Sequence, residues 1–178
     1  MDRTQKGVAI RVAIAALAGI FGLLLGATLT PHALGQTVTL HSRLSVAVVA
    51  TLSPAITLFV CIARLANHRF FTPEDINGSA LTSGSERARL LQALLQNTLE
   101  QATLAISVYF CSAIAFPSAF LGAIVAGGAM FLIGRIAFFA GYKNGAPSRA
   151  FGFAVTFYPT VLLLVGTAYF VIVRSAGS

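Results

Sequence analysis

The sequence predicts an all-α protein, a polytopic bundle of five transmembrane helices, from three observations. Of its 178 residues, 57% are hydrophobic and 10% are charged, and the mean hydropathy is +0.84. About a quarter of the residues in a soluble domain are charged, so this chain cannot cover a water-facing surface. Its apolar residues form charge-free runs with the length, about 20 residues, that a helix needs to cross a hydrocarbon core. Its cations gather at the edges of these runs.

The spans follow from the charge-free runs and one proline. Residues 12–29 and 44–63 are free of charge and long enough to cross a membrane. The next run, 102–134, is too long for one helix and too short for two. Pro117 divides it, because proline lacks a backbone donor and disfavours helix at the residue before it. The three remaining spans are therefore expected at about 89–113, 117–141 and 150–173.

Lysine and arginine are distributed unevenly between the two ends of these spans. With the N-terminus inside, ten of the 12 cations lie at inner ends, whereas Arg43 and Arg174 lie at outer ends. Because such residues are enriched on the cytoplasmic side, we expect a cytoplasmic N-terminus and an outer C-terminus. No continuous basic tract accompanies the net charge of +7, so the partner it indicates is a lipid bilayer and not nucleic acid.

The first apolar run has two interpretations. Its basic flank, and the small residues of Ala33-Leu34-Gly35 at a possible cleavage site, are typical of a signal peptide. The run is long for that role, however, and Gly22 and Gly26 have the spacing that lets membrane helices pack closely. We expect the helix to be retained. The chain then divides into an N-terminal segment at 1–43 and a membrane domain at 44–174, with an inner loop at 67–87.

Cysteine and histidine indicate neither a disulfide nor a metal site. Cys61 and Cys111 lie in apolar runs near opposite ends of their spans. The helical rise separates them by more than roughly 15 Å, whereas a disulfide needs Cα atoms within about 7 Å. The three histidines form no ligand motif. No metal site is predicted.

The third span carries a polar stripe along one helical face. Spacings of three and four residues align its members on that face, with Asn97 and Gln101 beside them. A carboxylate about ten residues into a span costs a few kcal/mol against lipid, so Glu100 should face protein or water. A ligand-binding cavity and a hydrogen-bond network that fixes helix packing both remain open. The stripe consists of Arg89, Gln92, Gln96, Glu100, Thr103 and Ser107.

Glu100 is expected to lie within reach of Arg135 on the fourth span, or of another cation. Helical rise puts Arg135 about 10 Å and Glu100 about 15 Å from the same membrane face, which long side chains can bridge within one subunit or across an interface. Tyr142, Lys143 and Arg149 follow at that face. Cations there could hold an anionic ligand and favour a thiolate. The alternative is ordinary anchoring at the membrane interface.

Two segments together resemble the MAPEG family, the membrane-associated proteins of eicosanoid and glutathione metabolism. Gln-Asn-Thr-Leu-Glu at 96–100 resembles its Asn-x-x-Glu signature. Arg135 to Tyr142, with Arg149 seven residues later, resembles its Arg-(x)6-Tyr-(x)6-Arg segment. The resemblance covers about residues 44–173. It implies a four-helix core in a homotrimer, with one extra N-terminal helix here, and glutathione held between subunits near the cytoplasmic face.

The resemblance also implies roles for individual residues. Asn97 and Glu100 match positions that contact glutathione, and Tyr142 matches a tyrosine that lines the site. Arg149 matches an arginine that stabilises the glutathione thiolate in some members. Arg135 matches a recurrent arginine of the fourth span. We therefore expect Arg149 to be catalytic and the other four residues to bind glutathione.

The sequence departs from the family pattern at two positions. Many active members carry an arginine one turn before the asparagine, and here that position is Ala93. Arg89, one turn further back, is the candidate to replace it as a glutathione contact. A tyrosine frequent in the family is Phe138 here.

Three functions remain to be distinguished. The first is a glutathione transferase or peroxidase that acts on hydrophobic substrates entering from the bilayer. The second is a non-catalytic lipid-binding or scaffold protein with the same fold. The third is a small transporter that uses the polar stripe, although a single carboxylate within the spans gives little support to a proton relay.

Overall fold

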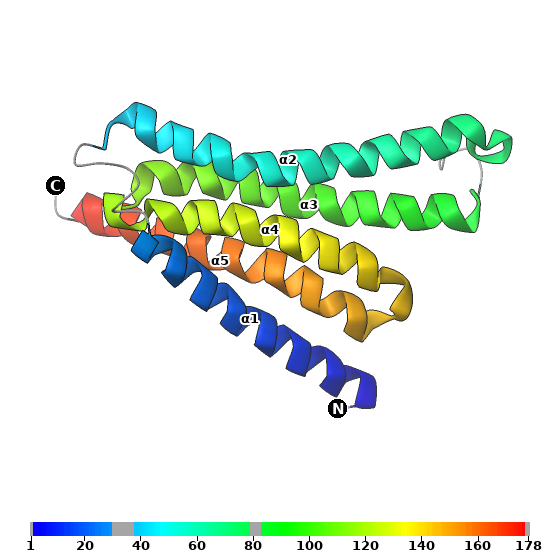
Figure 1. The fold of residues 1–178 in the computed structure, drawn as a ribbon, viewed down its shortest axis with the longest axis horizontal. Helices are drawn as coiled ribbons and strands as arrows, with labels where there is room; N and C mark the ends of the chain where they lie inside the picture. The colour runs from blue at the N-terminus through cyan, green and yellow to red at the C-terminus, as the bar shows by residue number, and fades with distance from the viewer. Residues whose placement is uncertain (1, 30–37, 79–82, 177–178) are drawn as a thin grey trace.

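The computed structural model describes residues 2–29, 38–78 and 83–176, which form an all-helical bundle (Figure 1). Five helices in these ranges are long and apolar enough to cross a membrane, so the predicted fold class is confirmed. The long helices are α1 (Arg3–Leu29), α2 (Leu40–Phe71), α3 (Glu86–Ala115), α4 (Leu121–Gly141) and α5 (Ala146–Ala176). Three short 3-10 helices are η1 (Pro73–Asp75), η2 (Ser118–Phe120) and η3 (Tyr142–Asn144).

Four of the five long helices extend beyond the predicted spans, because a charge-free run marks only the part of a helix that lies in hydrocarbon, whereas α4 begins later than predicted, after η2. Helix α2 begins after Thr39, whose hydroxyl accepts a hydrogen bond from the amide of Ser42 at 3.2 Å. Helix α5 begins at Ala146, earlier than predicted, because Pro147 fits the first turn of a helix. The chain turns instead at Gly145, whose φ is 88°.

Helices α2 and α3 pack against each other on one side of the bundle, and α1 packs against α4 and α5 on the other (Figure 1). The N-terminus, η1 and η3 lie at one end, here called the basic end. Its cations are Lys6, Arg11, Arg64, Arg69, Arg87, Arg89, Lys143 and Arg149. The opposite end carries Arg43 and Arg174.

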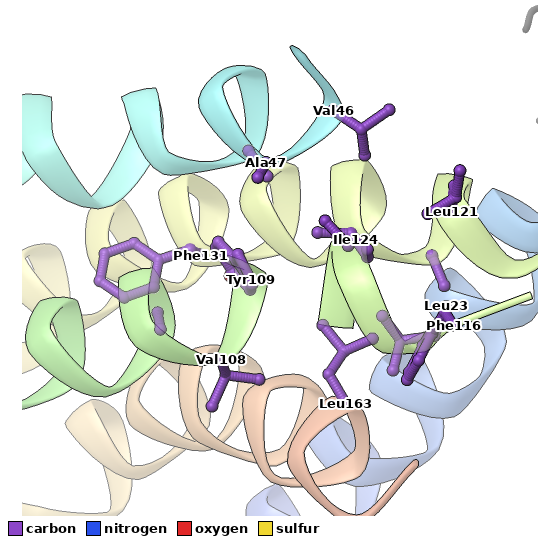
Figure 2. Close-up of a cluster of buried hydrophobic side chains, with 14 of the residues drawn as sticks. Leu23, Val46, Ala47, Val108, Tyr109, Phe116, Leu121, Ile124, Phe131 and Leu163 are labelled. Carbon is purple, nitrogen blue, oxygen red and sulfur yellow. The ribbon is translucent and has the colours of Figure 1, made fainter. Parts of the chain in front are cut away.

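The core combines very small residues with a few large ones. Ala47, Ala102 and Ala105 are completely buried, which brings the backbones of neighbouring helices close together. Larger side chains from all five helices fill the remaining space, as Figure 2 shows. Those labelled there are Leu23, Val46, Ala47, Val108, Tyr109, Phe116, Leu121, Ile124, Phe131 and Leu163.

The predicted packing role of two glycines in α1 is confirmed. A Cβ atom added at Gly22 would lie 2.6 Å from the Met130 sulfur, and one at Gly26 would lie 2.6 Å from the Gly122 carbonyl oxygen. At Gly26 the neighbouring atom is backbone, so only glycine lets α1 approach α4 this closely there, whereas at Gly22 it belongs to the flexible Met130 side chain. The possible cleavage site at residues 33–35 lies outside the described residues.

Both cysteines are free, as predicted. Cys61 is buried, with its sulfur 3.6 Å from the Thr98 hydroxyl, and Cys111 is exposed. They lie on different helices and have different surroundings.

Candidate functional site

A pocket of about 660 Å³, here called the site pocket, lies between α1, α3, α4 and α5 near the basic end. Four predicted site residues, Asn97, Glu100, Tyr142 and Arg149, line it although they come from separate elements. The structure thus brings most of the predicted constellation together. The remaining lining residues are Val8, Val12, Ala93, Gln96, Phe138, Ala146, Ala150 and Phe153.

Arg135 lies behind the wall of this pocket and is completely buried. Its Nη1 donates a hydrogen bond to Asn97 Oδ1 at 2.8 Å, and its Nε and Nη2 donate to Thr156 Oγ1 at 3.3 and 3.2 Å. Its guanidinium also stacks on Phe138, 4.5 Å from the ring centroid. One buried cation therefore joins α4 to α3 and α5.

This contact fixes which way the Asn97 amide points. Arginine has donors and no acceptor, so Asn97 must present its oxygen to Arg135. The N–H groups of Asn97 are then left for another partner. Because Asn97 also lines the site pocket, it can offer hydrogen-bond donors to a carbonyl or carboxylate bound there.

Two glycines make the arrangement around Arg135 possible. A Cβ atom added at Gly134 would lie 2.9 Å from the Gly152 carbonyl oxygen, and one at Gly152 would lie 2.7 Å from that of Gly134. The backbones of α4 and α5 can touch only where both residues lack a side chain. That close approach brings Thr156 within hydrogen-bond distance of Arg135.

Aromatic rings connect the buried Arg135 to the half-buried Arg149. Phe138 packs edge-on against Tyr142 with ring centroids 5.3 Å apart, and the Arg149 guanidinium lies 5.0 Å from the Tyr142 centroid. Positions 135, 138 and 142 follow the three- and four-residue spacing of one helical face. Each cation–π contact contributes about 0.5–2 kcal/mol, so this row of side chains holds Arg149 beside the pocket.

Arg149 is half-buried in the first turn of α5. The N-terminus of a helix carries partial positive charge, and a cation there is electrostatically unfavourable unless an anion is also present. The arrangement therefore favours binding of an anion near Arg149. Lys143, by contrast, does not line the site pocket and is exposed at the basic end.

The predicted ion pair between Glu100 and Arg135 is wrong within the protomer. Asn97 and not Glu100 lies on the face of α3 that meets α4, so the carboxylate is turned outward and is exposed. Glu100 instead accepts a hydrogen bond from Gln96 Nε2 at 2.9 Å, within its own helix. Its negative charge therefore stays available at the rim of the pocket.

A model of the MAPEG family matches residues 44–169. The chain belongs to the MAPEG family. No curated protein and no solved structure was found to match it. The matched segment contains most of α2, all of α3 and α4, and most of α5, so this MAPEG protein is an integral, multi-pass membrane protein with one helix added before the family core.

A second pocket, of about 320 Å³ and here called the arginine pocket, adjoins the first in this MAPEG protein. Ala93 and Gln96 line both pockets, and Arg89 lines only this one. Arg69 of α2 also lines it and donates a hydrogen bond to Gln92 Oε1 at 3.1 Å. The sequence marks Arg69 only as a cation at the end of a span, because nothing local relates it to α3.

A buried carboxylate holds the loop beside the arginine pocket. Asp75 accepts hydrogen bonds from the Ser85 amide at 2.7 Å and the Ser85 hydroxyl at 2.6 Å, and His68 Nε2 lies 2.9 Å from it. The hydroxyl and amide of Ser85, followed by the His68 ring, keep the pKa of Asp75 below its ordinary value. This Asp75 cluster joins the end of α2 to the start of α3, where Ser85 is the N-cap.

Proposed function

We propose that this MAPEG protein is a glutathione-dependent transferase or peroxidase that acts on hydrophobic electrophiles. The observation that carries the proposal is that one pocket is lined by hydrogen-bond donors, a carboxylate and a cation, contributed by Asn97, Glu100 and Arg149. Glutathione has matching groups, since it carries an ammonium, two carboxylates and a thiol. The family match over the core of the chain supports the same ligand.

Each of these side chains is chemically complementary to one group of glutathione. The outward-turned carboxylate of Glu100 suits the ammonium group, and the free N–H groups of Asn97 suit a carbonyl or carboxylate. Arg149, held by Tyr142, suits the thiolate, whose formation a nearby cation favours. Arg135 acts through Asn97, so we assign it a positioning role.

The arginine pocket offers a place for a remaining carboxylate. Arg89 donates a hydrogen bond to the Gly84 carbonyl at 3.1 Å, and Arg69 lies across the same pocket. Because position 93 is alanine, this residue places nothing beyond a Cβ atom between the arginine pocket and the site pocket. In this proposal Arg89 and Arg69 together replace the arginine that active relatives carry at that position.

The chemistry requires an ionised thiol and an apolar electrophile. In the transferase reaction the thiol proton goes to water, and the thiolate attacks an electrophilic carbon. A carbon–sulfur bond forms as the leaving group departs with its electron pair. In the peroxidase reaction two glutathione molecules reduce an organic hydroperoxide to an alcohol and water, and their sulfurs form a disulfide.

The outward-facing polar stripe supports a homotrimer. Gln96, Glu100, Thr103 and Ser107 are all exposed in the single chain, within a helix apolar enough to span the membrane. A polar face of this length is costly against lipid, and a second copy of the chain would cover it. Native mass spectrometry in mild detergent tests the proposed oligomeric state, and the mass of a trimer is expected.

The basic end is proposed to face the cytoplasm. It carries most of the cations of the chain, as the positive-inside rule requires of cytoplasmic ends. Both pockets then open toward the compartment that holds reduced glutathione. The orientation can be tested in a variant without Cys61 and Cys111, in which a cysteine replaces Asn144, an exposed residue of η3. An impermeant thiol reagent is then applied to either side of sealed vesicles, and labelling from the cytoplasmic side is expected.

The deciding experiment measures glutathione binding and turnover on the same preparation. Purified protein in nanodiscs is titrated with glutathione by calorimetry, and conjugation of an aryl halide is followed with and without protein. Binding with turnover supports the proposal. Absence of glutathione binding at millimolar concentration overturns it and makes transport the next function to test.

Two observations support a second candidate, a non-catalytic lipid-binding or scaffold protein. Ala93 and Phe138 both lack the polar group that active relatives often have at these positions, and Phe138 lines the site pocket. Glutathione binding without turnover would favour this candidate. In that case, the double variant Phe138→Tyr and Ala93→Arg tests directly whether these two residues account for the missing activity, because turnover should then appear.

A further inference from the structure

Helix α1 lies outside the family-matched segment 44–169, yet it contributes to the site pocket. Its Val8 and Val12, one helical turn apart, line the pocket together with Ala150 and Phe153 of α5. Helix α3 contributes mainly polar groups to the same pocket. The lining therefore has an apolar part built by α1 and α5, next to a polar part built by α3.

The position of α1 is fixed by close packing. Ala15 is completely buried, and a Cβ atom added at Gly19 would lie 3.2 Å from the ring of Pro159. Leu23 joins the main hydrophobic core. A helix docked along most of its length in this way provides a rigid wall.

The same helix also contacts the turn that carries Arg149. Arg11 Nη1 donates a hydrogen bond to the Pro147 carbonyl at 3.2 Å, two residues before Arg149. A Cβ atom added at Gly7 would lie 3.7 Å from Pro147 Cβ, which is ordinary van der Waals contact. The apolar wall and the proposed thiolate-stabilising cation are therefore mechanically connected.

We infer that α1 is a specificity element that the family core lacks. Val8 and Val12 bind the apolar part of the electrophile and limit its size at the point where Arg149 would hold the thiolate. The expected ligand class is a compact aryl or alkyl electrophile that partitions into the bilayer. This inference rests on the proposed function, because it names the second substrate of the same pocket.

The first measurement asks whether α1 is present in the mature protein. Intact-mass analysis of protein purified from membranes should give a chain that contains residues 8 and 12. A mature chain that begins near residue 36 would overturn the inference and leave the proposed glutathione site in place.

The second measurement compares electrophiles of two sizes. Val12→Phe and Val8→Phe should lower kcat/KM for a bulky aryl halide about tenfold more than for a compact one. Val12→Ala should shift this ratio toward the bulky substrate. The matched control is Ile14→Phe on the same helix, since Ile14 is 53% exposed and does not line the pocket. An equal ratio in all four variants would overturn the inference.

A binding readout separates failure of the inference from failure of the proposed function. An apolar carbene-generating photoprobe is added to protein in nanodiscs with and without excess compact aryl halide, and labelled residues are mapped by mass spectrometry. Protection at Val8 and Val12, with unchanged labelling at Ile14, supports the apolar site even if glutathione does not bind. Equal labelling of all three residues with and without competitor overturns it.

Discussion

The two halves of α3 differ in what their side chains do. From Ala102 to Ala115 half of the residues are buried, most of these are small, and the Ser112 hydroxyl lies 2.7 Å from that of Thr167 on α5. From Glu86 to Gln101 it is rich in polar residues, several of which line the two pockets. The half near the opposite end builds the core, and the half near the basic end builds the site.

The ends of α3 are also secured in different ways. At its C-terminus Arg43 donates hydrogen bonds to the carbonyls of Ala113 at 2.9 Å and Phe116 at 2.7 Å. A cation here satisfies carbonyls that have no helical partner. At its N-terminus the Asp75 carboxylate fixes the helix by accepting a hydrogen bond from the amide of Ser85, the N-cap residue. This comparison teaches that a helix with fixed ends can keep polar side chains available for a ligand between them.

The largest expected effect is on Arg149, which tests whether the half of the bundle near the basic end is catalytic. Arg149→Ala should lower kcat about a hundredfold and change glutathione affinity less, because the role of the cation increases as the thiol ionises. Arg149→Lys should restore activity only in part, since an ammonium lacks the planar fork. Calorimetry and initial rates measure both quantities. Full activity in Arg149→Ala would favour the non-catalytic function.

The next effect concerns Arg135, which joins the three helices around the site. Arg135→Leu leaves the buried oxygens of Asn97 and Thr156 without their donor, which should cost about 2 kcal/mol. Glu100→Leu should be tolerated better, because that carboxylate is exposed and bonds only within its own helix. Thermal unfolding in detergent compares them. Equal melting temperatures for wild type and both variants would show that Arg135 is not structural.

A smaller effect is expected from a pair of substitutions in the core half of α3. Ala105→Leu overpacks a completely buried position and should cost about 1–3 kcal/mol. The matched change Thr103→Leu lies at an exposed position and should leave protomer stability nearly unchanged while weakening the proposed trimer. Melting temperature and native mass spectrometry separate these results. Equal loss of stability in both variants would contradict the assignment of the two faces.

The smallest effect concerns pH and the Asp75 cluster. The folded-state pKa of Asp75 is below its ordinary value of 3.8. The stability it contributes is therefore present above that value and is lost as pH falls through the lower, folded-state pKa. Acid should open the loop before it unfolds the bundle, as measured by hydrogen exchange at Ser85. Asp75→Asn should expose that amide already at neutral pH, and an unchanged exchange rate would contradict the role of the carboxylate.

Much of the fold was predictable because hydropathy is local in the chain. Five spans follow from charge-free runs and from Pro117, whereas the candidate site residues follow from the resemblance of two short segments to the MAPEG family. Helical spacing alone also groups Arg135 with Tyr142 on one face. The spans and this grouping need only residue order and the geometry of one helix.

The three-dimensional contacts between helices were not predictable in this way. Whether Arg135 meets Glu100 or Asn97 depends on a small rotation of α3, and the axial depth of the residues does not determine it. Arg69 lines the arginine pocket from α2, and nothing in the sequence of α2 indicates that contact.

The sequence by itself therefore determined the fold class and the spans, because both are encoded in local composition and spacing, and the resemblance of two segments to the family indicated most of the candidate site residues. Only the tertiary structure decided which side chains meet. The approach of α4 to α5 at Gly134 and Gly152 brings Thr156 to Arg135, and the docking of α1 brings Val12 to the site pocket. These contacts depend on how closely and at what rotation helices pack, and packing is a property of several helices together.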